Sequence, residues 1–191
     1  MKLNTPRYDI GVIHGRFQVL HNDHIKYLMA GKELCDYLVV GITNPDPSLT
    51  KDSDTNPHRS TPLANPLTYY ERYVMTQAAL LEHGLNLSQF SIVPLPINVP
   101  ELIKYYVPLD AIFFLTIYDD WGHQKKKYFQ SLGLKIHVLW EVTLENKGLS
   151  SSDIRDSMVK DENWEEFVPS SVAKLMNEWD IAQRLKKISS K

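Results

Sequence analysis

Residues 8–24 read YDIGVIHGRFQVLHNDH, and this stretch decides the class of fold. Residues 8–14 are mostly apolar and rich in β-branched side chains, which is typical of a buried strand. After Gly15 the pattern changes, and residues 21–34 have the apolar periodicity of a helix. A strand that passes directly into a helix is the opening half of a βαβ unit. The stretch therefore predicts an α/β protein with a parallel sheet.

The alternation of strand and helix continues along the chain. Four further apolar runs follow the first strand, over residues 36–42, 90–93, 110–118 and 134–141. Helical or proline-rich segments separate these runs. Five buried strands that alternate with helices predict an open parallel sheet of about five strands, with helices on both faces and right-handed crossovers.

Two regions have the signals of well-defined helices. Residues 68–83 open with a capping box, in which Thr68 is followed three residues later by Glu71, and they end before a glycine. Towards the C-terminus only helical patterns remain, over residues 150–158 and 169–188. The fold is therefore expected to end in a C-terminal helical extension.

Length and composition indicate one globular domain. The chain has 191 residues, of which 43% are hydrophobic and 23% charged, close to the averages of globular proteins. These values exclude disordered, collagenous and disulfide-scaffold classes. We expect a single domain over residues 1–191, with an α/β core over 1–148 and a helical part over 149–191.

The charge balance limits the kinds of partner. With 21 basic and 23 acidic side chains, there is no overall positive field to hold nucleic acid or an anionic membrane. The longest uncharged apolar run, residues 111–118, is far shorter than a membrane span, and the N-terminus lacks a signal-peptide core. The single cysteine, Cys35, is read as a buried reduced thiol. A cytoplasmic protein is expected, and the sequence leaves a homo-oligomer open.

A long loop interrupts the pattern at residues 43–66. It contains five prolines, several polar residues and almost no apolar periodicity. Long loops of this kind in compact domains are usually disordered or serve as lids. Because it follows the second strand at the edge where open α/β sheets bind ligands, we expect a lid over the site.

The first group of residues with chemical potential follows the first strand. Gly15 and Arg16 form the turn, and His21 and His24 lie in the first turn of the next helix, three residues apart and on one face. Helix N-termini offer free N–H groups and a positive dipole, which favour phosphate. The residues indicate a phosphate site, although exposed polar histidines are the alternative. The remaining histidines and the cysteine have no zinc-site spacing.

The second group is Ser150-Ser151-Ser152-Asp153-Ile154-Arg155. Ser150 and Asp153 have capping-box spacing, so the segment can be read simply as the start of a helix. Three hydroxyl groups, free N–H groups and Arg155 on one helical turn also form an anion clamp.

Taken together, the two groups resemble the motifs of the HxGH nucleotidyltransferases, and within that family the archaeal-type nicotinamide-mononucleotide adenylyltransferases. Residues 15–24 are similar to the GRFQPxHxGH block, and residues 150–155 to the SxTxxR block. Residues 67–94 and 158–172 resemble two further parts of the family.

The resemblance implies a Rossmann-like sheet and roles for individual residues. It implies that His21 and His24 contact the phosphate chain and that Arg155, with the serines, holds the β and γ phosphates. A Mg²⁺ ion is expected to be carried by the triphosphate, with no protein metal site. The implied catalytic residues are His21, His24 and Arg155. The implied nucleotide-binding residues are Gly15, Arg16, Phe17, Gln18, Asp23, Ser150, Ser151 and Ser152. Weaker candidates for acceptor binding are Arg72, Tyr105 and Tyr106.

The chain also departs from the family pattern. Val19 replaces the motif proline, Asp23 replaces the motif glycine, and residues 115–120 replace a Ser-Gly-Asn segment. Asp23 either accepts a hydrogen bond from an exocyclic amino group of the nucleobase or points to solvent and complements the helix dipole. The tryptophan that would stack on nicotinamide is missing, and Tyr105 and Tyr106 are its possible substitutes.

The sequence thus predicts a Mg²⁺-dependent nucleotidyltransferase. It would join a nucleoside monophosphate from a triphosphate to a small phosphorylated acceptor and release pyrophosphate. ATP with nicotinamide mononucleotide is the leading pair of substrates. CTP with a small phosphate or phosphonate acceptor is the alternative, and a nucleotide-binding sensor without turnover is the alternative outside the enzymes.

Overall fold

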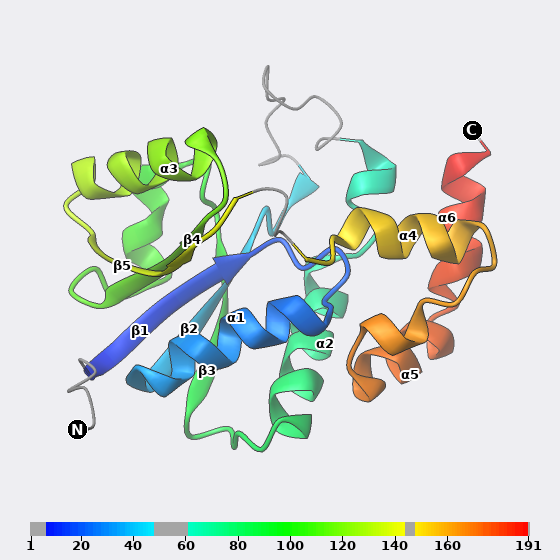
Figure 1. Ribbon diagram of the computed structural model, residues 1–191, viewed down its shortest axis with the longest axis horizontal. Helices are drawn as coiled ribbons and strands as arrows, with labels where there is room; N and C mark the ends of the chain where they lie inside the picture. The colour runs from blue at the N-terminus through cyan, green and yellow to red at the C-terminus, as the bar shows by residue number, and fades with distance from the viewer. Residues whose placement is uncertain (1–6, 48–60, 144–147, 191) are drawn as a thin grey trace.

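The computed structural model describes residues 7–47, 61–143 and 148–190. These residues form a five-stranded, fully parallel sheet with the order β3-β2-β1-β4-β5 (Figure 1). The strands are β1 (Tyr8–Gly15), β2 (Cys35–Thr43), β3 (Phe90–Leu95), β4 (Ile112–Ile117) and β5 (Lys135–Glu141). The predicted class of fold is confirmed, and each predicted apolar run forms one strand.

The central strand β1 pairs with β2 on one side and with β4 on the other. From β1 the chain proceeds through β2 to β3, and it then crosses back to form β4 and β5. The strand order therefore reverses between β1 and β4. In open parallel sheets, ligands bind at this reversal, beyond the carboxyl ends of the strands.

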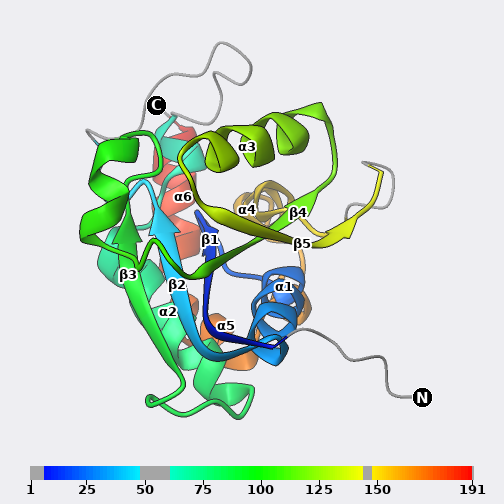
Figure 2. The same ribbon diagram turned by 90° about the vertical axis from the view of Figure 1, so that its left-hand side faces the viewer.

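Helices cover both faces of the sheet, as predicted. They are α1 (Asn22–Glu33), α2 (Tyr69–Glu82), α3 (Asp120–Ser131), α4 (Ser151–Val159), α5 (Ser170–Glu178) and α6 (Ile181–Ser189), with the 3₁₀ helices η3 (Pro62–Ala64), η4 (Pro100–Tyr105) and η6 (Glu165–Phe167). Neighbouring side chains of a strand point to opposite faces. Ile13 accordingly belongs to a buried cluster with α1, α2 and the C-terminal helices, whereas Val12 belongs to a cluster with α3 and η4. Figure 2 shows α1 and α3 on opposite sides of the sheet.

The C-terminal region differs from the prediction in one respect. The predicted helical stretch over residues 169–188 is confirmed, but it is divided into two helices, because α5 ends at Glu178 and α6 begins at Ile181. Asp180 between them has the left-handed conformation, with φ 53° and ψ 44°. Asp adopts this conformation more readily than most residues. The turn lets Val172 of α5 and Ile181 of α6 both reach the core, where each is fully buried.

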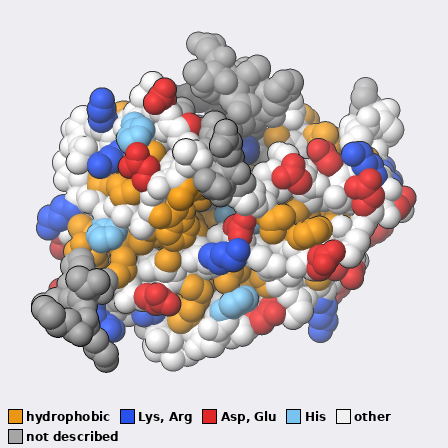
Figure 3. Space-filling model, in the orientation of Figure 1, with side chains coloured by type: hydrophobic (Ala, Val, Ile, Leu, Met, Phe, Trp, Pro, Cys, Tyr) orange, Lys and Arg blue, Asp and Glu red, His pale blue; other side chains and the backbone are white. Residues whose placement is uncertain are grey.

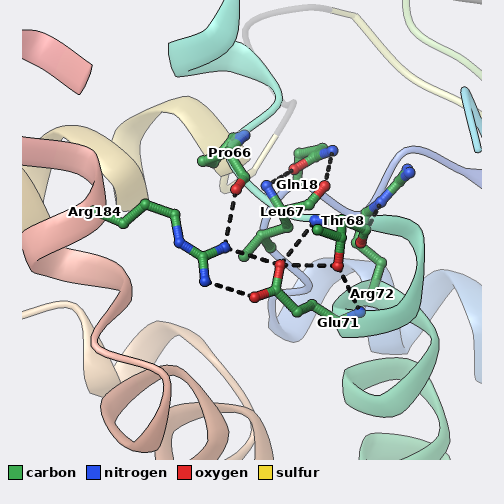
Figure 4. Close-up of polar contacts among 7 residues, drawn as sticks. All are labelled: Gln18, Pro66, Leu67, Thr68, Glu71, Arg72 and Arg184. Atoms are coloured by element: carbon green, nitrogen blue, oxygen red, sulfur yellow. Dashed lines mark hydrogen bonds and ion pairs between the residues drawn. The ribbon is translucent and has the colours of Figure 1, made fainter. Parts of the chain in front are cut away.

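The last helix is tied to the first turn of α2 by a group of polar contacts (Figure 4). Arg184 of α6 donates to both carboxylate oxygens of Glu71, at 2.6 and 2.9 Å, and to the carbonyl of Pro66 at 3.1 Å. Glu71 is also part of the predicted capping box with Thr68, which the structure contains. The start of α2 and the C-terminal helices are thus held together by a partly buried ion pair.

The surface agrees with the balanced charge of the sequence. On the face drawn in Figure 3, Lys and Arg side chains are interspersed with Asp and Glu side chains, and they do not form a continuous basic patch. Over the described ranges, no helix combines the length and the apolar character that crossing a membrane requires.

Candidate active site

A cavity of about 730 Å³ lies at the reversal of strand order, beyond the carboxyl ends of β1 and β4. The start of α1 and the start of α4 form part of its wall, and Figure 1 shows the N-terminal end of α4 next to the end of β1. Nine of the predicted site residues line this cavity. They are Gly15, Arg16, His21, Asp23, His24, Ser150, Ser151, Ser152 and Arg155. The fold thus brings the two motifs, which are more than 120 residues apart, into one site.

The two motif histidines form a stacked pair at the start of α1. Their rings lie 3.7 Å apart between centroids, and the backbone N–H of His21 donates to Nδ1 of His24 at 3.3 Å. Phe17 packs against His24 edge-on, with the centroids 5.1 Å apart. Phe17 has a left-handed backbone, with φ 51°, and is fully buried. It therefore packs against His24 of the stacked pair from the side of the protein core.

Both histidines are uncharged at neutral pH. Burial lowers the pKa of His21 to about 4, although the carboxylates of Asp23 and Asp153 act in the opposite direction. Burial also lowers the pKa of His24 well below its usual value, and a positive charge on His21 would lower it further. The pair therefore presents neutral imidazole to a ligand, as a hydrogen-bond donor and acceptor and not as a fixed positive charge.

The start of α4 combines a cap with an anion-binding arrangement. Ser150 is the N-cap and forms the predicted capping box with Asp153, whose backbone N–H donates to the Ser150 hydroxyl at 3.3 Å. The capping reading of this segment is therefore confirmed. Arg155 lies on the same turn and lines the cavity, so the cap is compatible with phosphate binding at this helix end.

Arg155 links the second motif to the first. Its side chain is 5% exposed, and it donates to the carbonyl of Gln18 and, at 3.0 Å, to the hydroxyl of Ser152. Its Nε has no hydrogen-bond partner among the described residues. Burial lowers the pKa of Arg155, but a guanidinium remains a cation at physiological pH. Arg155 is thus a fixed positive charge with donor capacity left at the edge of the cavity.

Asp23, which replaces the motif glycine, makes a second link. One carboxylate oxygen accepts from the Lys26 ammonium at 2.6 Å, and the other accepts from the backbone N–H of Leu149 at 2.7 Å. Burial acts to raise the pKa of Asp23, but these hydrogen bonds outweigh it and the pKa is lowered. A Cβ on Gly148 would lie 2.0 Å from the same oxygen, so Asp23 fits only because residue 148 is a glycine.

Arg72 is placed away from the cavity, within the scaffold. Its side chain is 2% exposed and donates to the backbone carbonyls of Arg16, Thr43 and Asn44 at 3.0, 2.7 and 2.8 Å. Burial and the nearby Arg16 lower its pKa to about 10. Arg72 therefore joins the ends of β1 and β2 and is not among the described residues that line the cavity, so its role in acceptor binding stays a prediction.

Four other predicted residues also lie outside the cavity lining. Tyr105 and Tyr106, at the end of η4, are 71% and 38% exposed. Phe17 is in the core, and the Gln18 side chain exchanges hydrogen bonds with the backbone of Leu67, both at 3.0 Å (Figure 4). These two motif residues pack beneath the cavity and do not line it, and their predicted contact with nucleotide stays a prediction.

The lid prediction for residues 43–66 falls largely on residues 48–60, which lie outside the described part of the chain. The described end of this segment forms η3, whose first turn is capped by Thr61. Ala64 of η3 lines the cavity. The segment therefore reaches the site at its C-terminal end.

Several lining residues were missed by sequence reasoning. They are His14, Lys26, Tyr27, Thr116, Tyr118, Lys125 and Trp140. The indole N–H of Trp140 donates to the Tyr118 hydroxyl at 3.2 Å, and Tyr27 packs edge-on against Trp140. His14, Thr116 and Tyr118 lie at the carboxyl end of a strand or directly after it. Because open parallel sheets bind ligands beyond the carboxyl ends of their strands, this position was the signal that could have identified them. Lys125 and Trp140 depend on how α3 and β5 pack, which has no local sequence signal.

N–H donors and cations at the reversal of strand order in an open parallel sheet are typical of a site that binds nucleotide phosphates. A sequence model of the cytidylyltransferase-like family matches residues 12–157, and the chain belongs to this family of nucleotidyltransferases. The resemblance seen in the sequence is thereby confirmed at the level of the superfamily.

Individual relatives refine this assignment. The chain is 47% identical to a phosphonoformate cytidylyltransferase from Streptomyces viridochromogenes over 92% of this chain and 95% of the relative. It is 32% identical to a nicotinamide-nucleotide adenylyltransferase from Thermococcus onnurineus over 94% of this chain and 88% of the relative. The similarity therefore favours the cytidylyltransferase alternative over the expected adenylyltransferase.

Solved structures support the fold. A bifunctional NMN adenylyltransferase/ADP-ribose pyrophosphatase from Francisella tularensis matches with a TM-score of 0.63 and 14% identity, over 92% of this chain. The chain spans about half, 52%, of that larger protein. A nicotinate-nucleotide adenylyltransferase structure from Vibrio parahaemolyticus, described as putative, matches with a TM-score of 0.59 and 13% identity over 92% of this chain and 96% of the other.

Proposed function

We propose that the protein transfers cytidine monophosphate from CTP to a small phosphonate acceptor and releases pyrophosphate. The observation that carries the proposal is the 47% identity to a phosphonoformate cytidylyltransferase over nearly the whole of both chains. Tyr105 and Tyr106, which the adenylyltransferase prediction used as substitutes for the missing tryptophan, lie outside the described cavity lining.

The reaction needs positioning and charge stabilisation more than proton transfer. An anionic oxygen of the phosphonate attacks the α-phosphorus of CTP, a new P–O bond forms, and the bond from the α-phosphorus to the bridging oxygen of pyrophosphate breaks. Because the nucleophile is already anionic, no strong general base is required. This agrees with histidines that burial keeps neutral, since they donate hydrogen bonds to phosphate oxygens without giving up a proton.

The residues of the two motifs have distinct tasks in this mechanism. His21, at the N-terminus of α1, contacts the phosphate chain, and His24 stacks against it and fixes the orientation of its ring. Arg155 and the N–H groups of the first turn of α4 stabilise the charge that develops on the leaving pyrophosphate. The hydrogen bonds from Arg155 to Gln18 and from Ser151 to Val19 hold this turn against the first motif.

A divalent ion fits this site as part of the nucleotide. Among the described residues that line the cavity, Asp23 has the one carboxylate, and both of its oxygens are engaged. This part of the lining offers N–H donors and cations for phosphate and not a set of metal ligands. The described residues contain no cluster of three His, Cys, Asp or Glu side chains with metal-site geometry. When bound, Mg²⁺ would neutralise part of the triphosphate charge. A related Francisella structure, 16% identical, was solved with AMP and a Mn ion.

The test is a matrix of four triphosphates against phosphonoformate, methylphosphonate and nicotinamide mononucleotide. Pyrophosphate release is measured, and the product is identified by mass. We expect CTP with phosphonoformate to give the highest kcat/KM. A preference for ATP with nicotinamide mononucleotide would overturn the proposal in favour of the adenylyltransferase, and no turnover with any pair would favour the sensor.

A further inference from the structure

His14 lies at the carboxyl end of β1 and lines the cavity, but neither motif includes it. Its side chain is 7% exposed. Neither Nδ1 nor Nε2 has a hydrogen-bond partner among the residues that the structure describes. A buried polar group without a partner costs about 1 to 3 kcal/mol, and such groups are uncommon in folded proteins. The imidazole is therefore available to a ligand that enters the cavity.

The position of the ring is fixed by its surroundings. His14 shares the sheet face of Val12, because residues two apart on a strand point the same way, and its ring packs against Phe129 of α3 at 5.4 Å between centroids. Burial lowers the pKa of His14 well below its usual value, and the Lys125 ammonium adds to this effect. The ring is thus a rigid neutral imidazole, which offers one N–H donor and one acceptor.

The neighbours of His14 on the cavity wall favour an anion. Lys125 of α3 lines the cavity and contributes a cation, which acts on the imidazole of His14. Among the described lining residues the acidic side chain is Asp23, and its carboxylate is engaged by Lys26 and Leu149. An imidazole N–H donor and an ammonium on the same side of the cavity match the oxygens of a carboxylate.

This group of residues is separate from the phosphate-binding motifs. His21 and His24 begin α1, which packs with the sheet face of Ile13, whereas His14 points to the opposite face, towards α3. The cavity therefore extends from the motif side, which receives the triphosphate, to the α3 side. A second substrate that approaches the α-phosphorus from the α3 side would meet His14.

We propose that His14, with Lys125, forms the acceptor subsite and binds the carboxylate of a small phosphonocarboxylate, so that the phosphonate faces the α-phosphorus. The inference rests on the proposed function and makes it more specific, because it assigns the selection of the acceptor to named residues. It predicts that the enzyme prefers an acceptor with a carboxylate next to the phosphonate over one without it.

The experiment compares phosphonoformate with methylphosphonate, which lacks the carboxylate. In His14→Phe the ring can still pack against Phe129, but both nitrogens are lost. We expect the KM for phosphonoformate to rise roughly 10- to 100-fold, as is usual for a lost hydrogen bond to a charged group. The ratio of kcat/KM between the two acceptors should fall towards one, while the KM for CTP changes less than the KM for phosphonoformate. Lys125→Gln, on α3, should lower the ratio in the same direction.

The matched control is His137→Phe. His137 lies on β5 outside the cavity lining, is partly buried, and has its Nδ1 within 3.0 Å of the Tyr8 hydroxyl, so this variant should keep the wild-type ratio. Circular dichroism confirms that each variant is folded. If His14→Phe does not fold, the ratio of kcat/KM between the two acceptors in Lys125→Gln tests the subsite, and an unchanged ratio would contradict it.

Three results would overturn the inference. They are an unchanged ratio in a folded His14→Phe variant, an equal loss with both acceptors, and a rise in the KM for CTP that matches the rise for phosphonoformate. Failure of the proposed function itself is seen separately, in the wild type. If the wild type turns over ATP with nicotinamide mononucleotide instead, calorimetric titration of phosphonoformate into the wild type and His14→Phe still tests the subsite. Equal binding of phosphonoformate to both proteins, or no binding to the wild type, would contradict the proposed subsite.

Discussion

At the scale of single residues, the site depends on side chains that connect distant parts of the chain. Arg155 donates to the carbonyl of Gln18, 137 residues earlier, and also to Ser152 in its own turn. A guanidinium makes both contacts and still has Nε to offer, whereas an ammonium is a single point charge. The same residue therefore assembles the site and supplies its buried positive charge.

Arg155→Lys is expected to lower kcat/KM roughly 10²- to 10³-fold, the usual loss for one donor that stabilises a transition state. Steady-state kinetics measure the loss. The control is Arg184→Lys, in which a partly buried arginine paired with Glu71 outside the cavity is changed in the same way. This control should affect the melting temperature more than kcat. A folded Arg155→Lys variant with wild-type kcat/KM would remove Arg155 from the mechanism.

Asp23 and Gly148 are expected to behave as a coupled pair. Gly148→Ala places a methyl group against the Asp23 carboxylate, which Lys26 and Leu149 hold in place, so it should destabilise the wild type. In the Asp23→Gly background that space is open, and the same substitution should cost about 1 kcal/mol less. Urea unfolding of the four proteins gives the coupling. Strictly additive effects would show that the close approach carries no energy.

At the scale of elements, the start of α5 is stabilised by a residue of another helix. The N-cap of α5 is Pro169, which has no side-chain cap to offer. The carboxylate of Glu82, at the end of α2, caps α5 instead. It accepts hydrogen bonds from the backbone N–H groups of Ser170 and Ser171 at 3.1 and 2.9 Å. A carboxylate at a helix N-terminus also complements the helix dipole. The packing of α2 against α5 therefore has a polar component at the surface.

Glu82→Gln should destabilise the protein at neutral pH by roughly 0.5 to 1 kcal/mol, a typical effect of a partly exposed cap. Burial acts to raise the pKa of Glu82, but the hydrogen bonds from Ser170 and Ser171 outweigh it and lower the pKa to about 2. A carboxyl group whose pKa is lower in the folded than in the unfolded protein stabilises the folded state at pH values above its unfolded-state pKa. This stabilisation is lost as the pH falls through the folded-state pKa, here about 2.

The melting temperatures of Glu82→Gln and the wild type should therefore differ at pH 7 and converge as the pH falls from about 4.5 towards 2. Glu178→Gln, a carboxylate at the C-terminal end of α5, is the control. A difference that stays constant between pH 7 and pH 3 would contradict the capping role of Glu82.

At the scale of the whole molecule, the C-terminal helices belong to the same core as the sheet. Six fully buried side chains of α4, α5 and α6 join the cluster that contains α1 and α2. They are Ile154, Met158, Val172, Met176, Ile181 and Leu185. Burial of such side chains contributes about 1.5 to 3 kcal/mol each, so together they amount to as much as the net stability of a typical domain.

A variant that ends at residue 148 is therefore expected to lack a cooperative unfolding transition. In the full chain, circular dichroism and tryptophan fluorescence should report one coincident transition in urea. A truncated protein that still unfolds cooperatively would show instead that the α/β part is stable without the helices.

The sequence by itself determined the elements and the location of the motifs. Strand and helix periodicity, the capping boxes at Thr68 and Ser150, and the glycine turn after the first strand are local signals, because each depends on residues a few positions apart. These signals fixed the sheet, and the two motifs indicated nucleotidyl transfer. The break at Asp180 was missed, because the apolar pattern of α5 continues into α6 with no proline or glycine to interrupt it.

The tertiary structure decided how individual side chains are used. Arg72, a candidate for acceptor binding, is turned inward because the ends of β1 and β2 present carbonyl groups to it. The His14 ring is held against Phe129 by the packing of α3, and Asp23 accepts a hydrogen bond from Leu149, 126 residues away. Such contacts depend on which distant segments are packed together. No periodicity in the sequence encodes them, so their roles followed only from the folded chain.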